Sequence, residues 1–163
     1  SKEILEMERY EKCKEYVYAN FSKIAYEPVR VAAFIHTNSV DNAITLLAIS
    51  RGLKLELARI AALFHDYSQY VENCPHKDHA RLSTLHANQY LKSTNLFKTT
   101  EIDDICFAIA QHSHKTSYDS PLCEALKDAD VFARFLENPT IKMEGIRKER
   151  LLNACADIEK AKP

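Results

Sequence analysis

The scarcity of glycine is the feature that most constrains this chain. Only two of its 163 residues are glycine, Gly52 and Gly145. The tight turns that join strands into hairpins favour glycine, so the chain is poorly suited to a hairpin-rich β fold. A loop that cradles phosphate through its backbone amides needs several glycines close together, and none can be built here. Any phosphate chemistry must therefore be done by side chains or by a metal ion.

The rest of the composition describes a chain that can form a soluble globular domain. Hydrophobic residues make up 46% of it, charged residues 28%, and the formal net charge is −1. Such a chain is too apolar to be disordered, and its charge argues against a nucleic-acid scaffold. It has no apolar run near the about 20 residues that cross a bilayer, no signal-peptide pattern, and five scattered cysteines typical of a reducing compartment. We expect a cytoplasmic protein that binds neither nucleic acid nor membrane.

Helical periodicity dominates the sequence. Apolar residues recur at three- and four-residue steps between charged residues, as in amphipathic helices. The pattern predicts helices over about residues 1–23, 36–51, 55–66, 79–93, 101–114, 121–136 and 140–160. Gly52 is placed to end the second helix, Pro121 and Thr140 are placed to begin the last two, and residues 67–78 have the composition of a loop. We predict one compact all-α domain of six to seven helices over residues 1–163.

The seven histidines all lie between positions 36 and 114. A single histidine is most often an ordinary core or surface residue, so the argument depends on their arrangement. The clearest local feature is His65-Asp66, which directly follows the apolar run Ala61–Phe64. Burying an aspartate beside a histidine is unfavourable unless the carboxylate is paired. A divalent cation would pair it, because imidazole nitrogen and carboxylate oxygen are both good ligands for first-row metals.

Further ligands for such a cation are available on other predicted helices. His36 begins the preceding helix, His79 begins the following one, and His112 lies near the end of the next. Asp128 and Asp130 interrupt an otherwise apolar helix, which indicates a specific role for at least one of them. A solvated helix face explains Asp128 better than it explains Asp130.

Four residues in a fixed order resemble the metal signature of the HD-domain superfamily of metal-dependent phosphohydrolases, which includes small stand-alone bacterial enzymes. These residues are His36, His65, Asp66 and Asp130. The sequence around these residues also resembles the family. Ala58–Asp66 is similar to the apolar segment that precedes and includes the His-Asp pair of the family. Ala129–Phe132 is likewise similar to its Ala-Asp-x-Leu ending.

The resemblance extends to two more histidines. His79 and His112 resemble the additional ligands found in branches of the family with a two-metal centre. The similarity covers about residues 30–136, and it leaves the predicted helices 1–23 and 140–160 as extensions of an HD-like core.

The resemblance implies a hydrolase that cleaves a nucleotide or another small phosphoester by attack of metal-bound water. It implies one or two divalent transition-metal ions, among which Mn, Fe, Co, Ni and Zn are not distinguished. The four signature residues would hold the first ion, and His79 with His112 a second. Asp66 would also act in catalysis, by bridging two ions or orienting the water. Lys115 and Arg134 could contact substrate phosphate, although solvated surface charge is the commoner role of such residues.

Other interpretations of the sequence stay open. Gln69 stands where many family members have a lysine that faces phosphate, and no Gly-Tyr-Pro triplet marks the cyclic-dinucleotide branch. One alternative is a non-catalytic HD-like module that binds a nucleotide or protein partner and keeps a structural metal. Another is a helical interaction protein with incidental histidines. The oligomeric state is open as well.

The remaining side chains near the motif have simpler explanations. Tyr67 and Tyr70 could line a nucleobase pocket, although aromatic packing is the ordinary role of such residues. We expect structural or surface roles for the other three histidines, His76, His86 and His114.

Overall fold

The protein is described by a computed structural model, which covers residues 7–163. Within this range the chain forms helices and no strand, so the predicted all-α fold is confirmed. The elements in chain order are α2 (Glu8–Ser22), α3 (Glu27–Arg51), α4 (Leu55–Phe64), α5 (Tyr67–Val71), η1 (His76–Asp78), α6 (His79–Thr94), α7 (Thr99–Gln111), α8 (Pro121–Glu137) and α9 (Gly145–Glu159). Residues 1–6, the first part of the predicted helix 1–23, lie outside the described residues.

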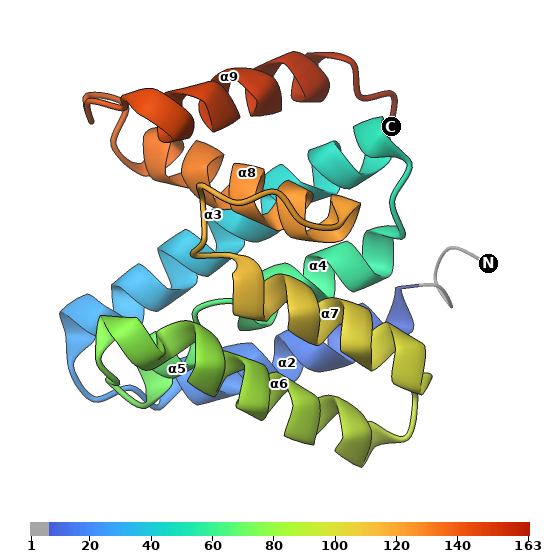
Figure 1. The fold of residues 1–163 in the computed structure, drawn as a ribbon. Helices are drawn as coiled ribbons and strands as arrows, with labels where there is room; N and C mark the ends of the chain where they lie inside the picture. Colours follow the sequence, from blue (N-terminus) through green and yellow to red (C-terminus); the bar gives the residue numbers. More distant parts are fainter. Residues whose placement is uncertain (1–6) are drawn as a thin grey trace.

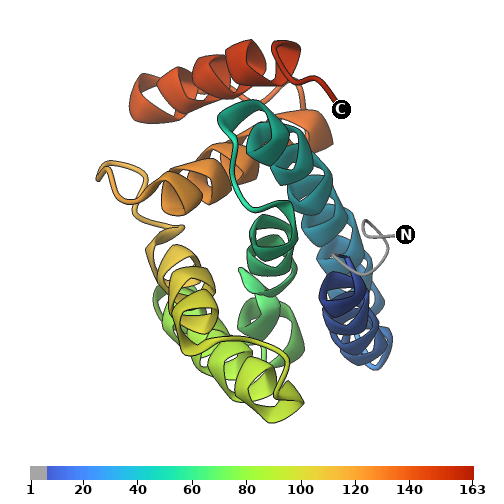
Figure 2. The ribbon, with the colours of Figure 1, turned by 90° about the vertical axis from the view of Figure 1, so that its right-hand side faces the viewer.

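Helix α4 lies in the middle of the bundle. It packs against α2, α3, α6, α7 and α8, while α9 lies across α8 at one end of the molecule (Figures 1 and 2). From Glu56 to Ser68 every side chain except that of Arg59 is buried. Since α4 ends inside the bundle, the two residues that follow it, His65 and Asp66, are delivered to the interior.

Helix α3 begins earlier than the sequence pattern predicts. It starts at Glu27, not near His36, and Pro28 occupies its first turn. Proline interrupts a helix only in its interior, because the first-turn amides have no partner within the helix. Pro28 therefore belongs to the start of α3, just after the break between α2 and α3, and His36 lies inside the helix instead of at its start.

Two other boundaries also differ from prediction. Helix α9 begins at Gly145 and not at Thr140, because the Thr140 hydroxyl donates to the Asn138 side chain (2.6 Å) in a turn that precedes the helix. The predicted loop 67–78 contains the single-turn helix α5 and the 3-10 helix η1. Gly52, by contrast, ends α3 in the left-handed conformation (φ 67°), as expected for a C-terminal cap.

None of the helices described for residues 7–163 combines the length and the apolar composition that a bilayer-spanning segment requires.

The core around α3 and α4 should dominate the free energy of unfolding. Leu47 on α3 is fully buried, whereas Leu152 on α9 is 58% exposed. We expect Leu47→Ala to lower the free energy of unfolding by about 2–5 kcal/mol, because it leaves a cavity, and Leu152→Ala to lower it by less than about 1 kcal/mol. Urea denaturation of both variants measures this difference, and equal losses would contradict the described packing.

Candidate metal centre

Four imidazoles and two carboxylates converge in the interior from six consecutive helices. His36 comes from inside α3, His79 is the first residue of α6, and Asp130 comes from α8. His65 and His112 follow the last residues of α4 and α7, and Asp66 precedes the first residue of α5. All six side chains are buried. The structure therefore brings together every residue that the sequence predicts as a metal ligand.

The first cluster consists of His36, His65, Asp66 and Asp130, whose ligand atoms all lie within 4.8 Å of one another. His36 Nε2 lies 2.9 Å from Asp130 Oδ1 and 3.4 Å from Asp66 Oδ2. His65 Nε2 lies 3.2 Å from His36 Nε2 and 3.3 Å from Asp66 Oδ2. Four ligand atoms thus surround one point.

The second cluster consists of Asp66, His79 and His112. His112 Nε2 lies 3.1 Å and His79 Nε2 lies 3.3 Å from Asp66 Oδ1. The two imidazole nitrogens lie 3.2 Å from each other. Asp66 therefore turns one carboxylate oxygen to each cluster, which is the arrangement that a bridging ligand requires.

Each imidazole is oriented by a contact on its other nitrogen. His65 Nδ1 donates to the Ala62 carbonyl (2.7 Å) and His112 Nδ1 to the Ile109 carbonyl (2.6 Å). His79 Nδ1 donates in the same way to the carbonyl of His76. A proton on Nδ1 leaves the Nε2 lone pair free to bind a metal, and outer contacts of this kind orient metal-binding histidines.

His36 differs from the others because its partner is a carboxylate. Its Nδ1 lies 2.9 Å from Glu137 Oε2, near the end of α8. Sequence reasoning missed Glu137, which lies seven residues after Asp130. That spacing puts the two acids on the same face of a helix, so a signal was present.

This donor set fits a divalent cation. The Nε2 atoms of His36 and His65 face each other, and the buried Asp130 Oδ1 makes no hydrogen bond of good geometry with the described residues, although His36 Nε2 lies 2.9 Å away. Such an arrangement is repulsive unless protons or a cation lie between the atoms. Ligands about 2.1 Å from one metal ion lie about 3.0–3.4 Å from each other, which is close to the observed separations. The mixture of imidazole and carboxylate suits first-row transition metals.

In the protein without metal, protons take the place of the cation. Burial disfavours charge on His36, but its contacts with Asp130, Asp66 and Glu137 outweigh burial and raise its pKa to about 11. Burial likewise disfavours charge on His65, but its interactions with Asp66 and Asp130 together outweigh burial and raise its pKa to about 9. Burial raises the pKa of Asp66, yet the histidines around it hold that pKa well below its usual range. Burial also raises the pKa of Asp130, but Lys115 and the two histidines hold it well below its usual range, so both carboxylates stay ionised.

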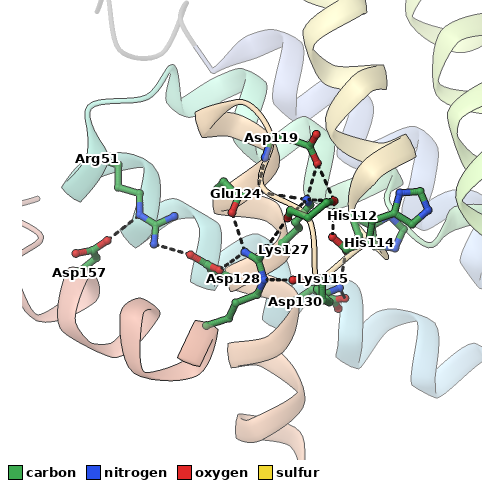
Figure 3. Close-up of polar contacts among 12 residues, drawn as sticks. Arg51, His112, His114, Lys115, Asp119, Glu124, Lys127, Asp128, Asp130 and Asp157 are labelled. Carbon is green, nitrogen blue, oxygen red and sulfur yellow. Dashed lines mark hydrogen bonds and ion pairs between the residues drawn. The ribbon is translucent and has the colours of Figure 1, made fainter. Parts of the chain in front are cut away.

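Lys115 belongs to the site itself. The prediction that its charge is most often solvated was wrong, because Lys115 is buried and donates to Asp130 Oδ2 (2.8 Å) and to the His112 carbonyl (Figure 3). It neutralises one oxygen of Asp130 and leaves the other directed at the first cluster. Arg134 is less enclosed, with 42% of its side chain exposed and its Nη2 3.8 Å from Asp66 Oδ2.

The position of Asp128 also differs from the prediction. The sequence favoured a solvated position, but the side chain is buried and accepts from Arg51 (2.7 Å) and Arg150 (2.9 Å). Periodicity on α8 alone could not reveal these partners, because they come from α3 and α9. Asp128 therefore joins helices, whereas Asp130 joins the metal cluster.

The second cluster and Asp130 of the first line a small cleft. Its volume is about 90 Å³ and its wall consists of Asp66, Gln69, His76, His79, His112, Ser113, Lys115, Asp130, Arg134 and Arg147. Next to it lies a larger pocket of about 370 Å³, which shares Gln69 and His76 with the cleft. A space large enough for an organic group therefore adjoins the cleft along Gln69 and His76.

The other histidines and the two tyrosines, for which packing or surface roles were expected, lie partly in the cleft and partly outside it. His114 is exposed and contacts Gln111, and His86 pairs with Glu72 away from the clusters. His76 is exposed but also lines the cleft, so it is more than a surface residue. Tyr67 is buried and stacks on Tyr16, whereas Tyr70 lines the larger pocket.

The comparisons with known proteins agree with this geometry. Residues 33–134 match the HD domain, and since this is more than half of the chain, the protein belongs to the HD domain family. The chain is also similar to the crystal structure of a predicted HD superfamily hydrolase from an uncultured Thermotogales bacterium. The two are 23% identical, with a TM-score of 0.62 over 91% of this chain and 87% of that one, which shows a shared fold. No curated protein matches the sequence.

The Glu137 contact should tune the affinity for metal. We expect Glu137→Gln to weaken the binding of Mn²⁺ or Co²⁺ about tenfold to a hundredfold, because it removes the carboxylate that orients His36. Competition with a chromophoric chelator measures this affinity. Glu144→Gln, at an exposed position before α9, is the control and should bind as the wild type does. Equal affinities for the two variants would show that Glu137 does not support the ligand.

Metal binding should also release protons. The raised pKa values of His36 (about 11) and His65 (about 9) mean that both hold protons below those values, so a metal must displace them. We expect about two protons to be released per first-site metal at neutral pH, and the apparent affinity to rise with pH from about 6 to about 8. Calorimetry in buffers of different ionisation enthalpy measures the release. A binding enthalpy that does not depend on the buffer would contradict this prediction.

Proposed function

We propose that this protein is a metal-dependent phosphohydrolase that acts on a nucleotide or another small phosphoester. The observation that carries the proposal is the Asp66 carboxylate, which is shared by two His/Asp clusters on the wall of a cleft. Membership of the HD domain family supports the same activity. The proposed cofactor is one or two divalent transition-metal ions, and the proposed partner is a small phosphorylated molecule and not a nucleic acid.

The proposed division of labour follows from the charges. A bound divalent cation lowers the pKa of a coordinated water to about 7 and offsets negative charge on phosphoryl oxygens. Asp66 stays ionised and can accept a hydrogen bond from the attacking water. Lys115 keeps Asp130 fixed through one oxygen. Arg134, half-exposed near Asp66, can donate to a phosphoryl oxygen.

The neighbouring pocket supports an organic group on the substrate. Its wall combines apolar side chains from the start of α3, including Val29 and Ala32, with the ring of Tyr70. Gln69 and Asn73 add amide groups that can donate and accept hydrogen bonds. Specific small-molecule pockets typically have this composition of apolar wall and few polar groups, and about 370 Å³ is within their usual range. A nucleoside has both the apolar faces and the polar edges to match it.

One observation favours a non-catalytic module as the second candidate. Gln69 lines the cleft at the position where many family members have a phosphate-facing lysine, so one expected cation is missing. In this alternative the metal would stabilise the fold, and the pocket would bind a nucleotide or a protein partner without turnover.

Metal analysis together with a substrate panel separates the two candidates. We expect the wild type, loaded with Mn²⁺, Fe²⁺, Co²⁺ or Ni²⁺, to release phosphate from at least one nucleotide or dinucleoside polyphosphate. His65→Ala and Asp66→Asn should lose stoichiometric metal and reduce release to the level of the blank, because each removes a ligand of the first cluster. His114→Ala, at an exposed residue outside the cleft, should retain both properties. Bound metal without phosphate release from any member of the panel would instead favour the non-catalytic module.

A further inference from the structure

Arg147 reaches the cleft from a part of the chain that the family resemblance does not cover. It lies in the first turn of α9, beyond the matched residues 33–134. It nevertheless lines the same cleft as Asp66, Asp130 and Arg134. The C-terminal helix therefore contributes a cation to the site that the core of the fold builds.

A buried ion-pair network holds α9 in this position. Arg150 is buried and donates to Asp128 (2.9 Å), to Glu124 (3.0 Å) and to the Lys115 carbonyl (2.9 Å). At the other end of α9, Arg51 bridges Asp128 and Asp157 (Figure 3). The helix is thus fixed to α8, to α3 and to the segment that carries Lys115.

This attachment determines where Arg147 lies. Arg147 and Arg150 are three residues apart, so they share one side of the helix. Since Arg150 is directed into the protein, Arg147 lies one turn earlier along the same side, at the rim of the cleft. Its position follows from the packing of α9, although the side chain itself is exposed.

The charges of the cleft are unevenly matched. Lys115 Nζ forms a close ion pair with Asp130 Oδ2, at 2.8 Å. Arg134 Nη2 forms a looser one with Asp66 Oδ2, at 3.8 Å. Arg147 forms no ion pair with any residue in the range 7–163. Two guanidinium groups that line one cleft of about 90 Å³ repel each other unless an anion lies between them.

We propose that Arg147 and Arg134 together bind the phosphate group of the substrate, so that α9 completes the substrate site. The inference rests on the proposed function for the identity of the anion. Guanidinium groups suit this role because their planar donors match phosphate oxygens and stay charged at all relevant pH values. The pair also supplies the positive charge that is absent at Gln69.

The test is the binding of inorganic phosphate, and of the non-hydrolysable methylenediphosphonate, to the metal-loaded full chain by calorimetry. We expect Arg147→Ala to weaken binding of these anions about tenfold to a hundredfold, because charge-assisted hydrogen bonds are lost. Arg147→Lys should bind with intermediate affinity, because it keeps the charge and loses the planar donors. Metal content and melting temperature of both variants should match the wild type, since Arg147 is exposed and is not part of either metal cluster.

Lys148→Ala is the matched control. It removes the same charge from the neighbouring residue on α9, which does not line the cleft, and should change anion affinity less than twofold. Anion affinities of Arg147→Ala and Lys148→Ala that agree within twofold would overturn the inference, as would a wild type that binds neither anion. The outcome is separate from that of the proposed function. Arg147-dependent anion binding without hydrolysis of any substrate would refute the activity and support the anion site.

Discussion

Asp66 carries a negative charge at a position from which water is almost excluded. Its side chain is only 3% exposed, and a carboxylate in such a place is strongly unfavourable unless positive charge surrounds it. His36 and His65 face one of its oxygens, and His79 and His112 face the other. These residues come from α3, α4, α6 and α7, so satisfying this one charge fixes how four helices meet. The arrangement that makes the carboxylate tolerable is also the arrangement that a pair of divalent cations requires.

The same constraint reaches the C-terminal helix through Lys115. This lysine supports Asp130 from the side opposite the first cluster, and its backbone carbonyl accepts from Arg150. Arg150 in turn binds Asp128, which also accepts from Arg51. A continuous set of buried polar contacts therefore joins α9 to a predicted metal ligand. Such networks stabilise a fold when every member is satisfied, and they are costly when one partner is removed.

Much of this arrangement could be predicted from the sequence. The parts that could not be predicted share one cause. The apolar run before His65-Asp66 and the acids within α8 are local signals, and the structure places all six predicted ligands together. The start of α3 was predicted too late, at about His36, because a proline can either interrupt a helix or occupy its first turn. Glu137, the burial of Asp128 and Lys115, and the approach of Arg147 depend on contacts between distant segments. Periodicity along one helix carries no information about which partner a neighbouring helix supplies.

The central claim is that Asp66 is shared between two cation sites, and anomalous diffraction tests it most directly. Crystals of the full chain grown with Mn²⁺ should show a peak bounded by His36, His65, Asp66 and Asp130, about 2.0–2.3 Å from their ligand atoms. A second peak should lie between Asp66 Oδ1, His79 and His112. No peak beside Asp66, or manganese bound only elsewhere on the protein, would contradict the account.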